Sequence, residues 1–235
     1  INMGKVKIKR KSTLIDMTAM SDVTVLLLTF FMLTSTFLQK EPITVITPSS
    51  VSEIKVPTAN LVTVLVSRKG NVFISLAGDK DSTYSSENMR AELIKSVAAE
   101  YNRVYGKQIS LTNDEVMTFA KTNMFGVSLA ELKGWLDLSQ EQRDAYIDPT
   151  KNPKAGIPID MNQDLSKPNE FQIWMRAIYN SSNPNIEGAI KRGEGIAIKA
   201  DKSTTYEKIQ VVMDNLQTMK MNKFSLMTAL KSEDE

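Results

Sequence analysis

The sequence predicts a single N-terminal transmembrane helix plus an α+β domain with a long helical insert. Residues 23–38 carry no charge and are mostly apolar, which is typical of a membrane-spanning segment. Residues 61–76 contain two apolar runs around a glycine-containing turn, which indicates a hairpin. Residues 195–228 read as a strand, an amphipathic helix and a strand. The domain is therefore built from a hairpin, helices and a strand-helix-strand unit.

The uncharged run of 16 residues is shorter than the about 20 helical residues that a bilayer core of roughly 30 Å requires. We therefore expect the transmembrane helix to cover residues 17–39, which places Asp22 inside it. An ionisable group at this depth usually faces a protein interior or a water path. On a helical wheel, Thr18, Asp22, Thr29 and Thr36 lie within about 40° of one another and form a polar stripe.

Three other interpretations of this segment remain open. A cleaved signal peptide fits the basic start, although the apolar run is long and no A-x-A site follows it. A buried helix of a soluble protein fits the apolar composition, but not the basic tail that precedes it. Asp22 could also lie at the membrane interface and cap the helix N-terminus, where an acidic side chain is favoured.

The residues around Asp22 carry a family resemblance. Residues 15–23 read IDMTAMSDV and residues 26–32 read LLLTFFM. This stretch resembles the membrane segment of the ExbD/TolR family, whose pattern is roughly I-N-x-T-P-x-x-D-V followed by an apolar run. Asp16 stands where asparagine is common and Ala19 where proline is usual. The resemblance implies that Asp22 carries protons in an inner-membrane motor.

Charge distribution predicts the orientation of the chain. Residues 1–15 hold five basic and no acidic residues, and only Lys40 closely follows the apolar run. The positive-inside rule therefore makes residues 1–16 a cytoplasmic tail and places everything after residue 39 outside the cytoplasm. The family resemblance implies that this outer side is the bacterial periplasm. A nucleic-acid-binding arm is the other interpretation of a polybasic tail. Without aromatic residues or a reading module beside it, we expect no nucleic-acid partner.

Composition also limits the chemistry. The chain has no Cys and no His, which excludes disulfides, Ser-His triads and most zinc sites. Asp160 and Asp164 lack the spacing of an EF-hand, and no phosphate-binding loop is present. Asp201 and Lys202 follow a predicted strand, but no nucleophile–base pair accompanies them. We therefore expect no enzyme activity, no catalytic residues, no metal and no cofactor.

Residues 40–60 contain three prolines and predict an extended tether. Within it, Ile43, Thr44, Val45 and Ile46 alternate weakly, as in a strand that adds to a partner or to a sheet edge. A solvated linker is the alternative. In ExbD-like proteins an extended segment at this place contacts the energy-transducing partner, so the resemblance implies that these four residues bind a partner.

The remaining domain, residues 61–235, contains a helical insert over residues 79–192. Apolar periodicity, capping boxes and helix-ending glycines predict the elements of the whole domain. Before the insert we expect strands at 61–66 and 72–76 joined by a turn at 68–71, and within it helices at 86–105 and 170–179 and capping boxes at 112–115 and 128–131. After the insert we expect a strand at 195–202, a helix at 204–219 and a strand at 223–228.

A second resemblance lies near the C-terminus. Residues 196–206 follow the pattern I-x-I-K-A-D-K-x-T-x-Y. Together with the helix and strand after them, they resemble the C-terminal half of the ExbD/TolR domain, so the resemblance covers residues 14–78 and 194–229. Family members usually join the two parts through one short helix, whereas 116 residues separate Gly78 from Gly195 here. The insert either binds a partner or the cell wall, or decorates the scaffold.

The resemblance implies an ExbD-like subunit of a proton-motive-force-driven inner-membrane motor that energises TonB-dependent outer-membrane transport. Cyclic protonation of Asp22 would move the helix, and the tether would pass force to the periplasmic domain. The implied partners are a multi-span ring protein of the ExbB/TolQ type, a second ExbD-like chain in a homo- or heterodimer, a TonB-like transducer and peptidoglycan.

Other functions fit the same sequence. One is a static membrane-anchored module that binds the cell wall or a partner. Another is a TolR-like subunit for envelope maintenance or gliding, and a third is an exported soluble domain released by signal cleavage.

Overall fold

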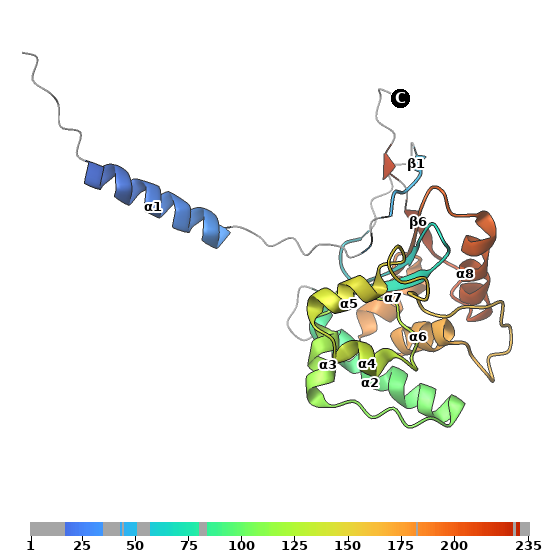
Figure 1. The fold of residues 1–235 in the computed structure, drawn as a ribbon. Coiled ribbons are helices and arrows are strands. Elements are labelled where there is room, and N and C mark those ends of the chain that lie inside the picture. The colour runs from blue at the N-terminus through green and yellow to red at the C-terminus, as the bar shows by residue number, and fades with distance from the viewer. Residues whose placement is uncertain are drawn as a thin grey trace, which may run out of the picture. The chain divides into compact units, whose positions relative to one another are not determined.

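The computed structural model describes residues 17–34, 43, 45–50, 57–79, 84–181, 183–227 and 229–230 (Figure 1). The chain divides into two compact units, Ile1–Lys40 and Glu41–Glu235. The first contains helix α1, and the second contains the mixed α/β domain that the sequence predicts.

Helix α1, Met17–Thr34, is the candidate membrane span among the described residues. Its 18 residues extend for about 27 Å at roughly 1.5 Å per residue. None of its side chains is buried, and its large apolar side chains are 56–87% exposed. The predicted helix continues to residue 39, but residues 35–40 lie outside the described part of the chain.

Five strands form the main sheet of the described domain, in the order β4-β3-β2-β5-β6. The predicted hairpin is confirmed, because β2 (Leu61–Val66) pairs antiparallel with β3 (Val72–Ala77). Gly70 in the turn adopts a φ of 84°, which favours glycine. β2 lies at the centre of the sheet, which explains its almost wholly apolar sequence.

The predicted strand-helix-strand unit is also confirmed. β5 (Ile196–Ala200) pairs parallel with β2, and β6 (Ser225–Met227) pairs parallel with β5. Helix α8 (Tyr206–Thr218) provides the crossover that a parallel pair needs. Its buried side chains are Val212, Asn215 and Leu216.

The segment between β3 and β5 is helical, as predicted. Its helices are α2 (Ser86–Tyr105), α3 (Asn113–Ala120), α4 (Leu132–Leu136), α5 (Gln140–Ile147), α6 (Glu170–Tyr179) and α7 (Pro184–Arg192). The predicted bounds of α2 and α6 are confirmed. Three further elements are not predicted from the sequence: α5, α7 and β4 (Met124–Phe125), which pairs antiparallel with β3. The insert therefore supplies one edge of the sheet.

One predicted capping box is confirmed and the other is wrong. Thr112 and Glu115 cap α3 reciprocally. Ser128 does not cap α4, which begins at Leu132 without a side-chain cap. The hydroxyl of Ser128 and the N–H of Leu129 instead donate to the Glu170 carboxylate, at 2.9 and 2.7 Å. A distant carboxylate has replaced the local partner that the sequence pattern indicates.

Aromatic side chains join the insert to the sheet. Trp174 of α6 lies 5.7 Å from Phe119 and 4.5 Å from Phe125, measured between ring centroids. All three are fully buried, as is Phe73 of β3. A Cβ at Gly126 would lie 2.1 Å from the Phe73 ring, so the chain passes this ring only because residue 126 is glycine. Sheet and insert thus share one core.

Buried amides make a second connection between the insert and α8. The Asn215 Oδ1 accepts hydrogen bonds from Asn169 Nδ2 at 3.0 Å and from Gln172 Nε2 at 2.8 Å. The Asn215 Nδ2 donates to the backbone oxygens of Asp160 and Val211, both at 2.8 Å. We call Asn169, Gln172 and Asn215 the amide cluster. Its members are buried and hydrogen-bonded, as buried polar groups must be to avoid a desolvation cost.

Candidate functional site

Asp22 is the single ionisable residue of α1. It lies in the second turn of the helix and is exposed, with apolar side chains over most of the remaining helix surface. An ionised carboxylate in such a segment requires water or hydrogen-bond donors from another chain.

Thr29 contributes less hydrogen-bonding capacity to the predicted polar stripe than its sequence position indicates. The Thr29 hydroxyl donates within the helix, at 3.0 Å to the Val25 oxygen and 2.9 Å to the Leu26 oxygen. Because its proton is already used, Thr29 can only accept a hydrogen bond from another group. Thr18 lies one turn before Asp22 on the same face. Thr36, the last residue of the stripe, lies outside the described residues.

The apolar part of the predicted tether is folded onto the domain. Ile43 is 4% exposed and Val45 is 8% exposed, and both belong to the main core. A solvated linker is therefore wrong for these two residues. Ile46 is 52% exposed, and Thr44 lies outside the described residues. Burial of alternate side chains matches the alternation seen in the sequence.

Backbone and carboxylate hydrogen bonds hold this segment in place. The Ile46 N–H donates to Asp201 Oδ2 at 3.3 Å, and the Lys202 N–H donates to the Ile46 oxygen at 2.8 Å. Further along, β1 (Ser49–Ser50) pairs parallel with β7 (Ala229–Leu230). Asp201 follows a strand, as predicted, but its contact with the tether is not predicted from the sequence.

Asp201 is the charged group of this junction. Burial disfavours its ionised form, but hydrogen bonds from the Ser203 and Ile46 N–H groups outweigh burial and lower the pKa of the carboxyl. Arg68, with its Nε 3.9 Å from Oδ1, acts in the same direction. Beside it lies a pocket of about 370 Å³ whose lining is Ile43, Ile46, Ser67, Arg68, Lys69, Pro149, Thr150 and Asp201. The tether, the hairpin turn and the insert therefore meet here.

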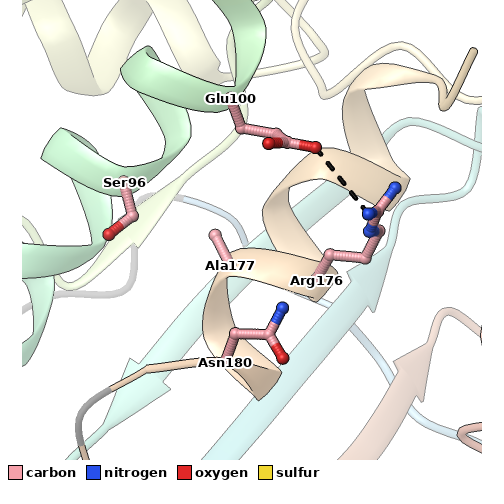
Figure 2. A pocket seen from close by; sticks show the side chains of 5 residues that line it. All are labelled: Ser96, Glu100, Arg176, Ala177 and Asn180. Carbon is pink, nitrogen blue, oxygen red and sulfur yellow. Dashed lines mark ion pairs between the residues drawn. The ribbon is translucent and has the colours of Figure 1, made fainter. Parts of the chain in front are cut away.

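Ligand-holding chemistry is sparse in the described part of the chain. No group of three or more His, Cys, Asp or Glu side chains occurs there that could hold a metal ion. A polar pocket lies in the insert, between α2 and α6, with Glu100 and Arg176 on its walls (Figure 2).

Comparison with known families bears on the first half of the chain. The model of the family described as "Biopolymer transport protein ExbD/TolR" matches residues 9–124. Over these residues the chain belongs to the ExbD/TolR family. No curated protein and no solved structure matches the chain. The ExbD/TolR match includes Asp22, the tether and the hairpin, and continues through α2 and α3 of the insert.

ExbD/TolR membership indicates a subunit of an energising complex for biopolymer transport, anchored to a membrane by α1. The family generally works with partners of the ExbB/TolQ and TonB/TolA kinds. The predicted resemblance of residues 194–229 lies beyond the matched range and stays a prediction.

Proposed function

We propose that the chain is the ExbD-like subunit of a proton-motive-force-driven motor in the bacterial inner membrane, which energises TonB-dependent outer-membrane transport. Asp22 carries the proton, and the periplasmic domain transmits force. The observation that carries this proposal is the position of Asp22, a lone ionisable residue in an exposed apolar helix of an ExbD/TolR segment.

Physical properties of α1 support a membrane or ring environment. An isolated apolar helix in water would leave every large side chain unburied, and each such side chain gains about 1.5–3 kcal/mol on full burial. The hydroxyls of Thr24 and Thr34 donate to the oxygens of Met20 and Phe30, at 2.7 and 2.8 Å. These hydroxyls therefore need no partner from a lipid or from the walls of a ring protein.

Protonation of Asp22 provides the switch. The neutral carboxyl tolerates an apolar wall, whereas the ionised form needs a water path or donors in an ExbB/TolQ-like ring. Moving one elementary charge through 100 mV releases about 2.3 kcal/mol. This exceeds thermal energy several-fold and is sufficient to bias each movement of the helix within the ring.

The tether would then deliver the movement to the domain. Its buried residues, Ile43 and Val45, fix the start of the folded unit, and Ile46 is paired with the Asp201 loop. A pull on α1 therefore acts first on this short contact. A TonB-like transducer, a second ExbD-like chain and peptidoglycan are the proposed periplasmic partners.

The test compares Asp22→Asn with Asp16→Asn in the full chain, expressed at equal levels in the native host. Asparagine keeps the size and hydrogen-bonding capacity of Asp22 but cannot ionise. We expect Asp22→Asn to insert and to co-purify with the ring protein but to abolish energy-dependent uptake through outer-membrane receptors. We expect Asp16→Asn to be active, because the family pattern has asparagine at that position.

Two readouts separate the possible roles. Loss of receptor-dependent uptake supports the TonB-linked function, whereas detergent sensitivity with normal uptake would indicate a TolR-like role in envelope maintenance. Wild-type performance of Asp22→Asn in both assays would refute proton transfer by Asp22 and favour a static anchor.

A further inference from the structure

A small polar pocket lies in the insert, between α2 and α6. It measures about 160 Å³ and is lined by Ser96, Glu100, Arg176, Ala177 and Asn180 (Figure 2). Ligand sites for drug-sized molecules usually measure roughly 300–1,000 Å³, so this pocket suits a smaller molecule. None of its lining residues belongs to α1, to the tether or to the main sheet.

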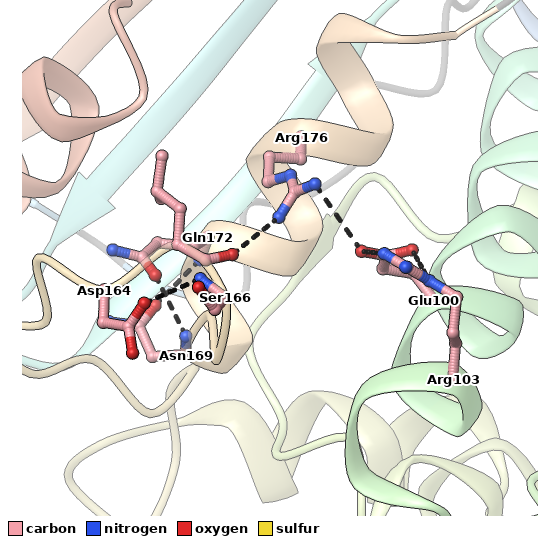
Figure 3. Close-up of polar contacts among 8 residues, drawn as sticks. Glu100, Arg103, Asp164, Ser166, Asn169, Gln172 and Arg176 are labelled. Carbon is pink, nitrogen blue, oxygen red and sulfur yellow. Dashed lines mark hydrogen bonds and ion pairs between the residues drawn. The ribbon is translucent and has the colours of Figure 1, made fainter.

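Glu100 is already neutralised by a neighbour on its own helix. Arg103 donates from Nη2 to Oε1 at 2.7 Å and from Nε to Oε2 at 3.0 Å, a bidentate pair (Figure 3). The hydrogen bond from Arg103 is also the main cause that lowers the pKa of the Glu100 carboxyl. The single negative charge of Glu100 is therefore shared between this close pair with Arg103 and the more distant guanidinium of Arg176.

Arg176 is incompletely satisfied by its contacts. Its Nη2 lies 3.8 Å from Glu100 Oε1, beyond hydrogen-bond distance, and its Nη1 donates to the Leu165 oxygen at 3.4 Å (Figure 3). Within the described part of the chain these are its two polar contacts. A guanidinium has five N–H donors in a planar fork, and the Arg176 side chain is only 34% exposed. Arg176 thus keeps unused N–H donors beside the partly open polar pocket between α2 and α6.

Charge and shape together specify the ligand. Arg176 and Glu100 line the pocket, and Arg103 lies outside the lining but is paired with Glu100, so the three groups together carry one net positive charge, which favours an anion. The methyl group of Ala177 keeps the space between α2 and α6 open, while Ser96 and Asn180 add a hydroxyl and an amide to the lining. We propose that this pocket binds the carboxylate of a small, amino-acid-sized molecule through the guanidinium of Arg176.

The experiment uses the full chain in detergent micelles and titrates it with sodium acetate and L-alanine, followed by NMR chemical shifts of α2 and α6. Acetamide and L-alaninamide are the matched probes, because they keep the size but remove the negative charge. We expect saturable shifts with both carboxylates, and at least tenfold weaker binding of both amides.

Three variants assign the binding to this pocket. Arg176→Gln removes the guanidinium group and should weaken carboxylate binding at least tenfold. Ala177→Leu should block the pocket, whereas Ala99→Leu, at an exposed position of α2, should bind as the wild type does. Equal binding of amides and carboxylates, unchanged binding in both pocket variants, or no saturable shift with either carboxylate would overturn the proposal.

Discussion

Replacing Asn215 by leucine should destabilise the insert, although Asn215 lies in α8. The change removes four hydrogen bonds at about 1 kcal/mol each, two accepted by Oδ1 and two donated by Nδ2. Leucine has a similar size and regains about 1–2 kcal/mol through burial of apolar surface. Gln172 and Asn169 keep other acceptors, at the Asn162 oxygen and the Asp160 carboxylate. We therefore expect a net loss of about 2–3 kcal/mol.

Tryptophan fluorescence can report the expected loss of stability within the insert. The two tryptophans of the chain, Trp135 and Trp174, both lie in the insert. Because insert and α8 share the amide cluster and one core, the urea midpoint reported by fluorescence should fall in Asn215→Leu. Gln217→Ala, at an exposed position of the same helix, is the control and should leave the free energy of unfolding within about 0.5 kcal/mol of wild type. A wild-type fluorescence midpoint in Asn215→Leu would refute the coupling.

Three further changes test other parts of the structure. Gly126→Ala should lower the melting temperature because its Cβ meets the buried Phe73 ring. Gly134→Ala adds a Cβ that meets nothing within 4 Å and lies in a helix, so it should raise the free energy of unfolding by up to about 1 kcal/mol. Equal melting temperatures of the two variants would contradict this difference. Burial raises the pKa of the Glu170 carboxyl, so its neutral form stabilises the fold at low pH and that stability is lost as pH rises through the folded-state pKa. In Glu170→Gln, the free energy of unfolding measured with urea should therefore change less between about pH 4 and pH 7 than in the wild type. An unchanged pH dependence would argue that Glu170 does not contribute to it. Val45→Asp should release the docked tether and speed hydrogen exchange at the Ile46 amide, whereas unaltered exchange would argue that Val45 does not hold it.

Local signals in the sequence predict most of the framework. The bounds of α2 follow from its apolar period and from Gly106, which ends the helix in a left-handed conformation. The hairpin follows from two apolar runs on either side of the turn that contains Gly70. The Ser128 capping box fails because Glu170, 42 residues away, takes its hydroxyl. A pattern of four residues carries no information about such a distant competitor.

One candidate site is visible in the sequence, whereas the others depend on contacts between distant residues. Asp22 stands out because a lone carboxylate interrupts an apolar run, and the surrounding motif resembles the membrane segment of the ExbD/TolR family. The docking of Ile46 depends on Asp201, which is 155 residues later in the chain. The pocket at Arg176 depends on how closely α2 approaches α6. Only packing brings these groups together, so sequence periodicity could not reveal either contact.

The position of β2 has a consequence for biosynthesis. Its hydrogen-bonding partners are β3, which follows at once, and β5, which begins at Ile196. At a translation rate of about 5–20 residues per second, the far edge of β2 waits roughly 7–25 s for its second partner. During that interval an apolar strand edge can pair with another nascent chain. This pairing of distant segments raises the contact order and predicts slow folding, with the far edge of β2 unpaired until residues 196–200 have emerged.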